Sequence, residues 1–119
     1  MEIKKFVING KEVQFVNSWR KTRNGFAHDS TMFIDGCRHS EATCTYWNRT
    51  WESYPYQTVM HRVASNEYQH RADQLRHQFM AEKGYCKMTE KRAVEFDAIC
   101  QADTYLVFYQ AICDAIAAY

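Results

Sequence analysis

A thiol, an imidazole and two carboxylates lie within seven residues of one another in the first half of the chain. Cys37 and His39 are two residues apart, so they share one face of an extended segment, and Asp35 and Glu41 continue the same spacing. These are the groups that nucleophilic catalysis requires. A polar strand face beside a tight turn is also typical of a solvated surface, and no third partner is fixed by the sequence. We therefore assign no active site here, and only a deep pocket around His39 would support one.

Metal chemistry is a second candidate that the spacing disfavours. His70 and His77 are seven residues apart on a predicted helix, which places them about 10.5 Å apart along its axis, too far to share one ion directly. The cysteines are odd in number and have no C-x-x-C spacing, so they indicate neither a disulfide framework nor a zinc site. They are Cys37, Cys44, Cys86, Cys100 and Cys113. We expect five reduced thiols, no metal and no cofactor.

Binding chemistry is concentrated in the stretch NRTWESYPYQ, residues 48–57, which holds the only proline of the chain. One guanidinium and three aromatic rings form a cluster of the kind found at interaction hot spots and at stacking platforms for single-stranded nucleic acid: Arg49, Trp51, Tyr54 and Tyr56. The alternative is a packed corner, in which the aromatic rings cover a sheet edge while Pro55 begins a helix. Both interpretations are compatible with the sequence.

A polar ridge with a spacing of seven residues follows on the predicted helix. It consists of Arg62, Gln69, Arg76 and Lys83. Three more cations, Arg20, Lys21 and Arg23, lie on a predicted loop at 19–25. Such ridges are ordinarily solvated helix faces, but together with the loop this one could line a track for phosphates or for an acidic partner.

Three turn signals indicate how the first 48 residues are folded. The dipeptides Asn9-Gly10, Asn24-Gly25 and Asp35-Gly36 tolerate positive φ and favour tight hairpin turns. Between them lie segments rich in β-branched and aromatic residues, so the sequence predicts four strands in an antiparallel meander. A two-residue turn at Asn9-Gly10 would pair Phe6 with Val13 and Lys4 with Phe15, which brings a charge to the presumed core face.

The second half is predicted to be helical. Residues 56–83 contain neither Gly nor Pro and form one long helix, with Pro55 in its first turn and Gly84 just past its end. Its early apolar residues would cover the sheet, and its later ones would meet the helical region that Thr89 opens as N-cap. Asp103-Thr104 is the predicted break. An apolar stripe with helical spacing then follows: Tyr105, Phe108, Tyr109, Ile112, Cys113 and Ile116.

Length and composition fit a single α+β domain over residues 1–119, a four-stranded antiparallel meander at 1–48 and a helical part at 49–119 with one or two C-terminal helices. Of its 119 residues, 46% are hydrophobic and 24% charged, which argues against disorder. No apolar run is long enough for a membrane span or a signal peptide, so we expect a cytoplasmic protein. Residues 93–119 hold four acids and no Lys or Arg. Their stripe packs on the long helix or forms a homo-oligomer contact.

Four segments together resemble a known kind of protein. The hairpin FVINGKEVQF, the turn RNGFAH, the stretch YWNRTWESYPYQTVM and the later MTEKRAVEFDAI are similar to small accessory proteins of phages and mobile elements of Gram-positive bacteria. The resemblance covers most of residues 1–99, and the tail from Gln101 departs from it. It implies a protein of the bacterial cytoplasm, of the anti-CRISPR or anti-defence type, and it brings no catalytic residues.

These observations favour a non-enzymatic protein that binds and inhibits a host defence protein, with a CRISPR–Cas effector nuclease as the expected partner. The alternative is a nucleic-acid-binding module that uses the basic helix ridge and the aromatic corner. A small enzyme centred on Cys37 and His39 is the third hypothesis.

Overall fold

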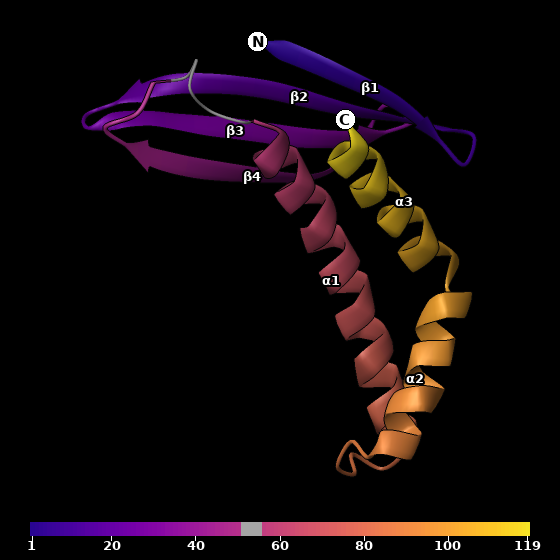
Figure 1. Ribbon diagram of the computed structural model, residues 1–119. Helices are drawn as coiled ribbons and strands as arrows, with labels where there is room; N and C mark the ends of the chain where they lie inside the picture. The colour runs from indigo at the N-terminus through magenta and orange to yellow at the C-terminus, as the bar shows by residue number, and fades with distance from the viewer. Residues whose placement is uncertain (51–55) are drawn as a thin grey trace.

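The computed structural model describes residues 1–50 and 56–119, in which a four-stranded sheet is followed by three helices (Figure 1). The strands are antiparallel and neighbours in chain order: β1 (Glu2–Ile8), β2 (Lys11–Thr22), β3 (Gly25–Ile34) and β4 (Cys37–Trp47). The helices are α1 (Gln57–Glu82), α2 (Glu90–Ala102) and α3 (Thr104–Ala118). This is the α+β fold predicted from the sequence, a meander followed by a long helix and two C-terminal helices.

Two of the three hairpin turns have the predicted chemistry. Asn9 and Gly10 have φ of 51° and 75°, and Asp35 and Gly36 have φ of 49° and 80°, the left-handed values that two-residue turns of type I′ require. The first of these turns sets the register of β1 and β2, with Phe6 opposite Val13 and Lys4 opposite Phe15, as predicted.

The middle turn is shorter than the sequence suggested. Instead of a loop at 19–25, β2 continues to Thr22, which pairs with Gly25, and the turn consists of Arg23 and Asn24. The charged end of β2 does not break the strand because its side chains reach solvent. Glycine is needed at position 25 because β4 passes close to its backbone, and not because its φ is positive. A side-chain carbon there would collide with the carbonyl oxygen of Tyr46 on β4.

Among the residues that the structure describes, the helices cover one face of the sheet. Val59, Met60 and Val63 of α1 are fully buried, and the start of this helix packs on β3 and β4. The end of α3 lies beside α1 and reaches β1, so that the two helices cover the inner face together (Figure 1). The sheet-covering role predicted for the first half of the long helix is confirmed.

Lys4 carries its charge to the edge of this core, and the structure provides partners for it. Its Nζ donates to the Tyr119 hydroxyl at 2.6 Å, lies 3.2 Å from a Glu2 carboxylate oxygen and stands over the Tyr56 ring at 5.5 Å. These contacts, first of all the one with Tyr119, raise the pKa of Lys4. The cation predicted on the core face is therefore accommodated at its rim.

The second half of α1 leaves the sheet and forms an arm with α2 (Figure 1). Leu75 and Phe79 are buried in this half, and the ring of Phe79 lies 5.7 Å from that of Phe96 on α2. The predicted change of packing partner along the long helix is therefore confirmed. Gly84 follows the helix end at φ 72°, the position predicted for it.

The cap of α2 and the break between the two C-terminal helices lie where they were predicted. The Thr89 hydroxyl accepts from the Arg92 backbone N–H at 3.3 Å and begins α2. Asp103 separates α2 from α3, and its carboxylate accepts from the Leu106 N–H at 3.0 Å. Five of the six residues of the apolar stripe are buried. Tyr105, in the first turn of α3, is the exception and is more than half exposed.

Candidate interaction surface at the sheet tip

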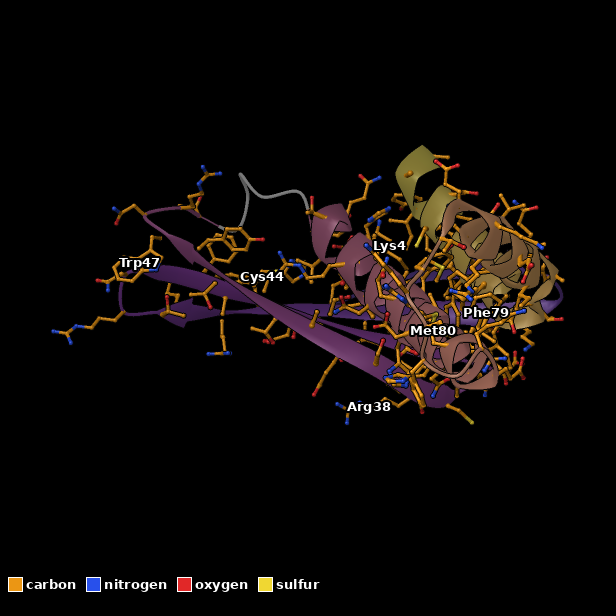
Figure 2. All side chains as sticks on the ribbon, turned by 90° about the horizontal axis from the view of Figure 1, so that it is seen from below. Lys4, Arg38, Cys44, Trp47, Phe79 and Met80 are labelled. Atoms are coloured by element: carbon orange, nitrogen blue, oxygen red, sulfur yellow. The ribbon has the colours of Figure 1, made fainter. Side chains whose placement is uncertain are left out.

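The sheet extends past the helices at one end, which we call the sheet tip: residues 19–25 and 45–49. Figure 2 shows Trp47 at this end, on the opposite side of the molecule from Phe79 and Met80 of the arm. The two helices that cover the inner face do not reach it. The side chains of the sheet tip therefore have the exposure that a binding surface needs.

Strand pairing brings two distant basic segments together at the sheet tip. Gly25 of β3 pairs with Thr22 of β2 on one side and with Trp47 of β4 on the other. The Asn48 N–H then donates to the Asn24 carbonyl oxygen at 2.7 Å, which holds the chain after β4 against the β2–β3 turn. Four exposed cations consequently share this end of the sheet: Arg20, Lys21, Arg23 and Arg49.

Aromatic side chains lie among these cations. Trp47 is 69% exposed and Trp19 is 39% exposed. Phe26 is buried on the face of the sheet that Trp19 shares and Trp47 does not, and its ring is stacked with that of Tyr46 at 5.1 Å. A shallow hollow of about 150 Å³ opens beside the turn. It is lined by Thr22, Arg23, Asn24, Thr45, Tyr46 and Trp47.

The charge of the sheet tip is only partly compensated. Arg20 lies 3.5 Å from Asp29, an exposed ion pair whose net stabilisation is small. Within residues 1–50 and 56–119, Lys21, Arg23 and Arg49 make no ion pair. Exposed guanidinium groups beside a tryptophan and a small hollow are the composition of an interaction hot spot.

The predicted ridge on the long helix is separate from the sheet tip. Arg62 lies at the sheet, where its Nη1 donates to Cys44 Sγ at 2.9 Å. Lys83 pairs with Glu95 of α2 at 3.1 Å, while Gln69 and Arg76 are exposed along α1. Since 21 residues of helix span about 31 Å, the ridge runs from the sheet to the end of the arm and forms no single site with residues 19–25.

Two residues of the predicted aromatic corner, Trp51 and Tyr54, lie outside the described residues, as does Pro55. Arg49 is described and belongs to the sheet tip. Trp47 was not among the predicted site residues, although a tryptophan at the end of a predicted strand, two residues before an arginine, is a usable signal. Trp47 is exposed because it alternates along β4 with Tyr46 and so lies on the face of the sheet opposite the helices, and only the structure shows which face that is.

The possible catalytic group around Cys37 does not converge. Asp35 accepts the Glu12 N–H at 2.9 Å, Glu41 pairs with Arg38 at 2.5 Å, and His39 Nδ1 lies 3.2 Å from the Tyr109 hydroxyl. Each of these groups is thus engaged with a different neighbour, and the Cys37 thiol is exposed. None of the five cysteines forms a disulfide in the structure.

Among the described residues, no cluster of three or more His, Cys, Asp or Glu side chains is arranged to hold a metal ion. None of the described helices is both long enough and apolar enough to cross a membrane. Comparison of the chain with protein-family models, with curated proteins and with solved structures gave no match.

Proposed function

We propose that this protein acts by binding, and that it is a phage or mobile-element protein of the bacterial cytoplasm that inhibits a host defence protein. The partner we favour is a CRISPR–Cas effector nuclease. The sheet tip is the observation that carries this proposal, because exposed arginines beside Trp47 are typical of protein-binding surfaces. The sequence resemblance to accessory proteins of mobile elements supplies the class of partner.

The charge of the sheet tip fits this partner. An effector complex contains a guide RNA held along its backbone, so it presents phosphates as well as protein surface. Three cations without an ion partner in the described part of the chain can bind such an anionic surface. Binding there would prevent the effector from engaging its target without any chemistry by the inhibitor.

The double substitution Arg23→Ala/Arg49→Ala tests the proposal. Both side chains are exposed, so we expect an almost unchanged melting temperature. A hot-spot arginine is worth about 2 kcal/mol or more, so we expect affinity for the effector to fall at least about thirtyfold. The measurement is biolayer interferometry against purified effector complexes, together with inhibition of DNA cleavage.

Lys91→Ala is the matched control, since Lys91 is an exposed cation at the start of α2, far from the sheet tip. It should leave binding unchanged. If the wild-type chain binds no effector complex, the choice of partner is wrong. If the double variant binds as well as the wild type, the sheet tip is not the binding surface.

Nucleic acid is the second candidate partner, favoured by the position of Trp47 beside the cations. A base stacked on this ring would contribute about 1–3 kcal/mol. We then expect single-stranded RNA or DNA to bind alone, with an affinity that falls steeply as salt increases. Removal of Arg23 and Arg49 should lower the salt slope by about one for each phosphate that the chain no longer neutralises. Affinity for the effector protein without its RNA would favour the first proposal instead.

A further inference from the structure

The arm contains a helix that is held at few points. No residue of α2 is buried. Its described attachments are the Phe96 ring against Phe79, the Glu95 carboxylate with Lys83, and Asp103 with Arg71 at 2.7 Å. Between these points its seam with α1 and α3 stays open.

A groove of about 360 Å³ follows this seam. Its floor contains Tyr68 of α1, Cys100 of α2, and Val107 and Ala111 of α3. Val107 is 50% exposed, so a large part of this apolar floor faces solvent. A second hollow of about 370 Å³ shares Tyr68 and Cys100 and continues along α2.

The rim of the groove is acidic. Asp97 and Asp114 both line it. Each accepts an amide of its own helix, from Gln101 and Gln110, both at 2.9 Å. Neither forms an ion pair with any described residue, and residues 93–119 contain no Lys or Arg.

The other acids of this segment are neutralised, so the uncompensated charge is concentrated at the groove. Glu95 is paired with Lys83, and Asp103 with Arg71. Burial is the main cause that raises the pKa of the Cys100 thiol, and the negative charges of Asp97 and Asp103 add to it. An apolar floor with a negative rim defines the chemistry of a complementary ligand.

We propose that this groove binds a cationic amphipathic helix of another protein. The aliphatic face of such a helix would lie on Val107 and Ala111, with Lys or Arg side chains at Asp97 and Asp114. On α2, the groove and the adjoining hollow are lined from Ala93 to Gln101, which provides about 13 Å of wall, enough for about two turns of a ligand helix. The surface is independent of the sheet tip and adds a second partner to the proposed function.

A model ligand tests the groove with the full chain. The probe is a fluorescent peptide of about 14 residues with leucines at i, i+3, i+4 and i+7 and lysines elsewhere. A matched peptide carries glutamates in place of the lysines. We expect saturable binding of the lysine peptide by fluorescence anisotropy, and binding of the glutamate peptide at least about tenfold weaker.

Two variants locate the binding. Asp97→Asn/Asp114→Asn keeps the shape of the rim and removes its charge, so affinity for the lysine peptide should fall about five- to tenfold. Val107→Asn makes the floor polar and should weaken binding at least about tenfold. The control is Val94→Asn, since Val94 lies on α2, is 72% exposed and does not line the groove. It should bind as the wild type does.

Thiol protection gives a readout that needs no variant. Cys100 lines the groove, whereas Cys86 is exposed in the α1–α2 connection. Bound lysine peptide should slow alkylation of Cys100 in the wild-type chain and leave that of Cys86 unchanged. Equal protection of both thiols, or none, would overturn the proposal.

Two further results would also overturn it. One is a reduction of peptide binding in Val94→Asn as large as in Val107→Asn, which would mean nonspecific adsorption to the arm. The other is a wild-type chain that is dimeric by light scattering and becomes monomeric with Val107→Asn. A second copy would then be the occupant.

Discussion

At the scale of single residues, Gly25 is a position where even one added side-chain carbon would clash. A Cβ there would collide with the Tyr46 carbonyl oxygen, whereas one at Gly10 would meet nothing within 4 Å. We expect Gly25→Ala to separate β3 from β4 at the sheet tip and to cost more than about 2 kcal/mol of unfolding free energy. Gly10→Ala, whose backbone has φ of 75°, should cost only about 1–2 kcal/mol.

Urea unfolding of the two variants measures this difference. The contrast is informative because both glycines lie at hairpin turns and only one has a neighbouring strand against it. A Gly25→Ala chain as stable as Gly10→Ala would mean that β4 ends before the sheet tip, and Arg49 would then be free of the β2–β3 turn.

Asp103 combines two roles in one carboxylate. It caps α3 through the Leu106 N–H and accepts both Arg71 Nε at 3.2 Å and Arg71 Nη2 at 2.7 Å. The Arg71 hydrogen bonds are the main cause that lowers the pKa of Asp103. The folded chain therefore releases this proton more readily than the unfolded chain, and the resulting stabilisation is complete above the ordinary Asp pKa of about 4. It is lost as the pH falls through the lower folded value.

We expect Asp103→Ala to lower the unfolding free energy by about 1–2 kcal/mol at pH 7, because it removes a helix cap and a well-formed ion pair. The difference from the wild type should shrink as the pH falls below about 4. Thr89→Ala removes the cap of α2 without removing a charge, so its smaller cost should be independent of pH. A constant difference for Asp103→Ala would contradict the role of Arg71.

Residues with a local signal were predictable from the sequence. The turn dipeptides at Asn9 and Asp35, the cap Thr89 and the break at Asp103 all act through their own backbone. Arg23 and Arg49 were each identified as candidates, but their meeting was not. It depends on the lengths of β2 and β4 and on the hydrogen bond between Asn48 and Asn24, which are properties of the sheet.

At the scale of elements, α2 and α3 contribute very differently to the fold although they are adjacent. The apolar face of α3 is buried against the sheet-covering half of α1, and Ile112 is fully buried. We expect Ile112→Ala to cost about 2–5 kcal/mol. Val94→Ala in α2 should change stability by less than about 0.5 kcal/mol, because this side chain is mostly exposed.

Equilibrium denaturation of the two variants and of a chain that ends at Asp103 checks this contrast. The shortened chain should lose its cooperative transition, since it lacks all six buried residues of α3. A shortened chain that still unfolds cooperatively, with an unchanged mass in solution, would show that α3 is dispensable.

The helices show that periodicity predicts where an element lies and which face is apolar, but not what packs against that face. The spacing of apolar residues identified the two faces of α1 and the stripe of α3, because burial follows helical period. In α2, Phe96, Ile99 and Cys100 also share a side, yet none of them is buried. How many residues pack against α2 depends on the direction in which α1 leaves the sheet, and no local sequence pattern encodes that direction.

At the scale of the whole molecule, the two proposed surfaces lie on different parts of the fold: the sheet tip is on the meander, and the groove lies between the helices α1, α2 and α3, which Figure 1 shows extending away from the sheet. The sheet tip combines cations with exposed aromatic rings, and the groove combines an apolar floor with acids. Their opposite charges fit different partners. The near-neutral net charge of +1 therefore conceals a strongly uneven distribution.

The molecule is more elongated than a compact domain of its length. The structure has a radius of gyration of 17.3 Å and extents of 50 × 34 × 24 Å, whereas a compact domain of 119 residues would have about 13.5 Å. The excess comes from the arm, which projects from the sheet and leaves the groove accessible. Small-angle X-ray scattering of the monomer should give a radius near the larger value at every concentration. A radius near 13.5 Å would mean that the arm folds back against the sheet, and a rise with concentration would mean that a second copy covers the groove.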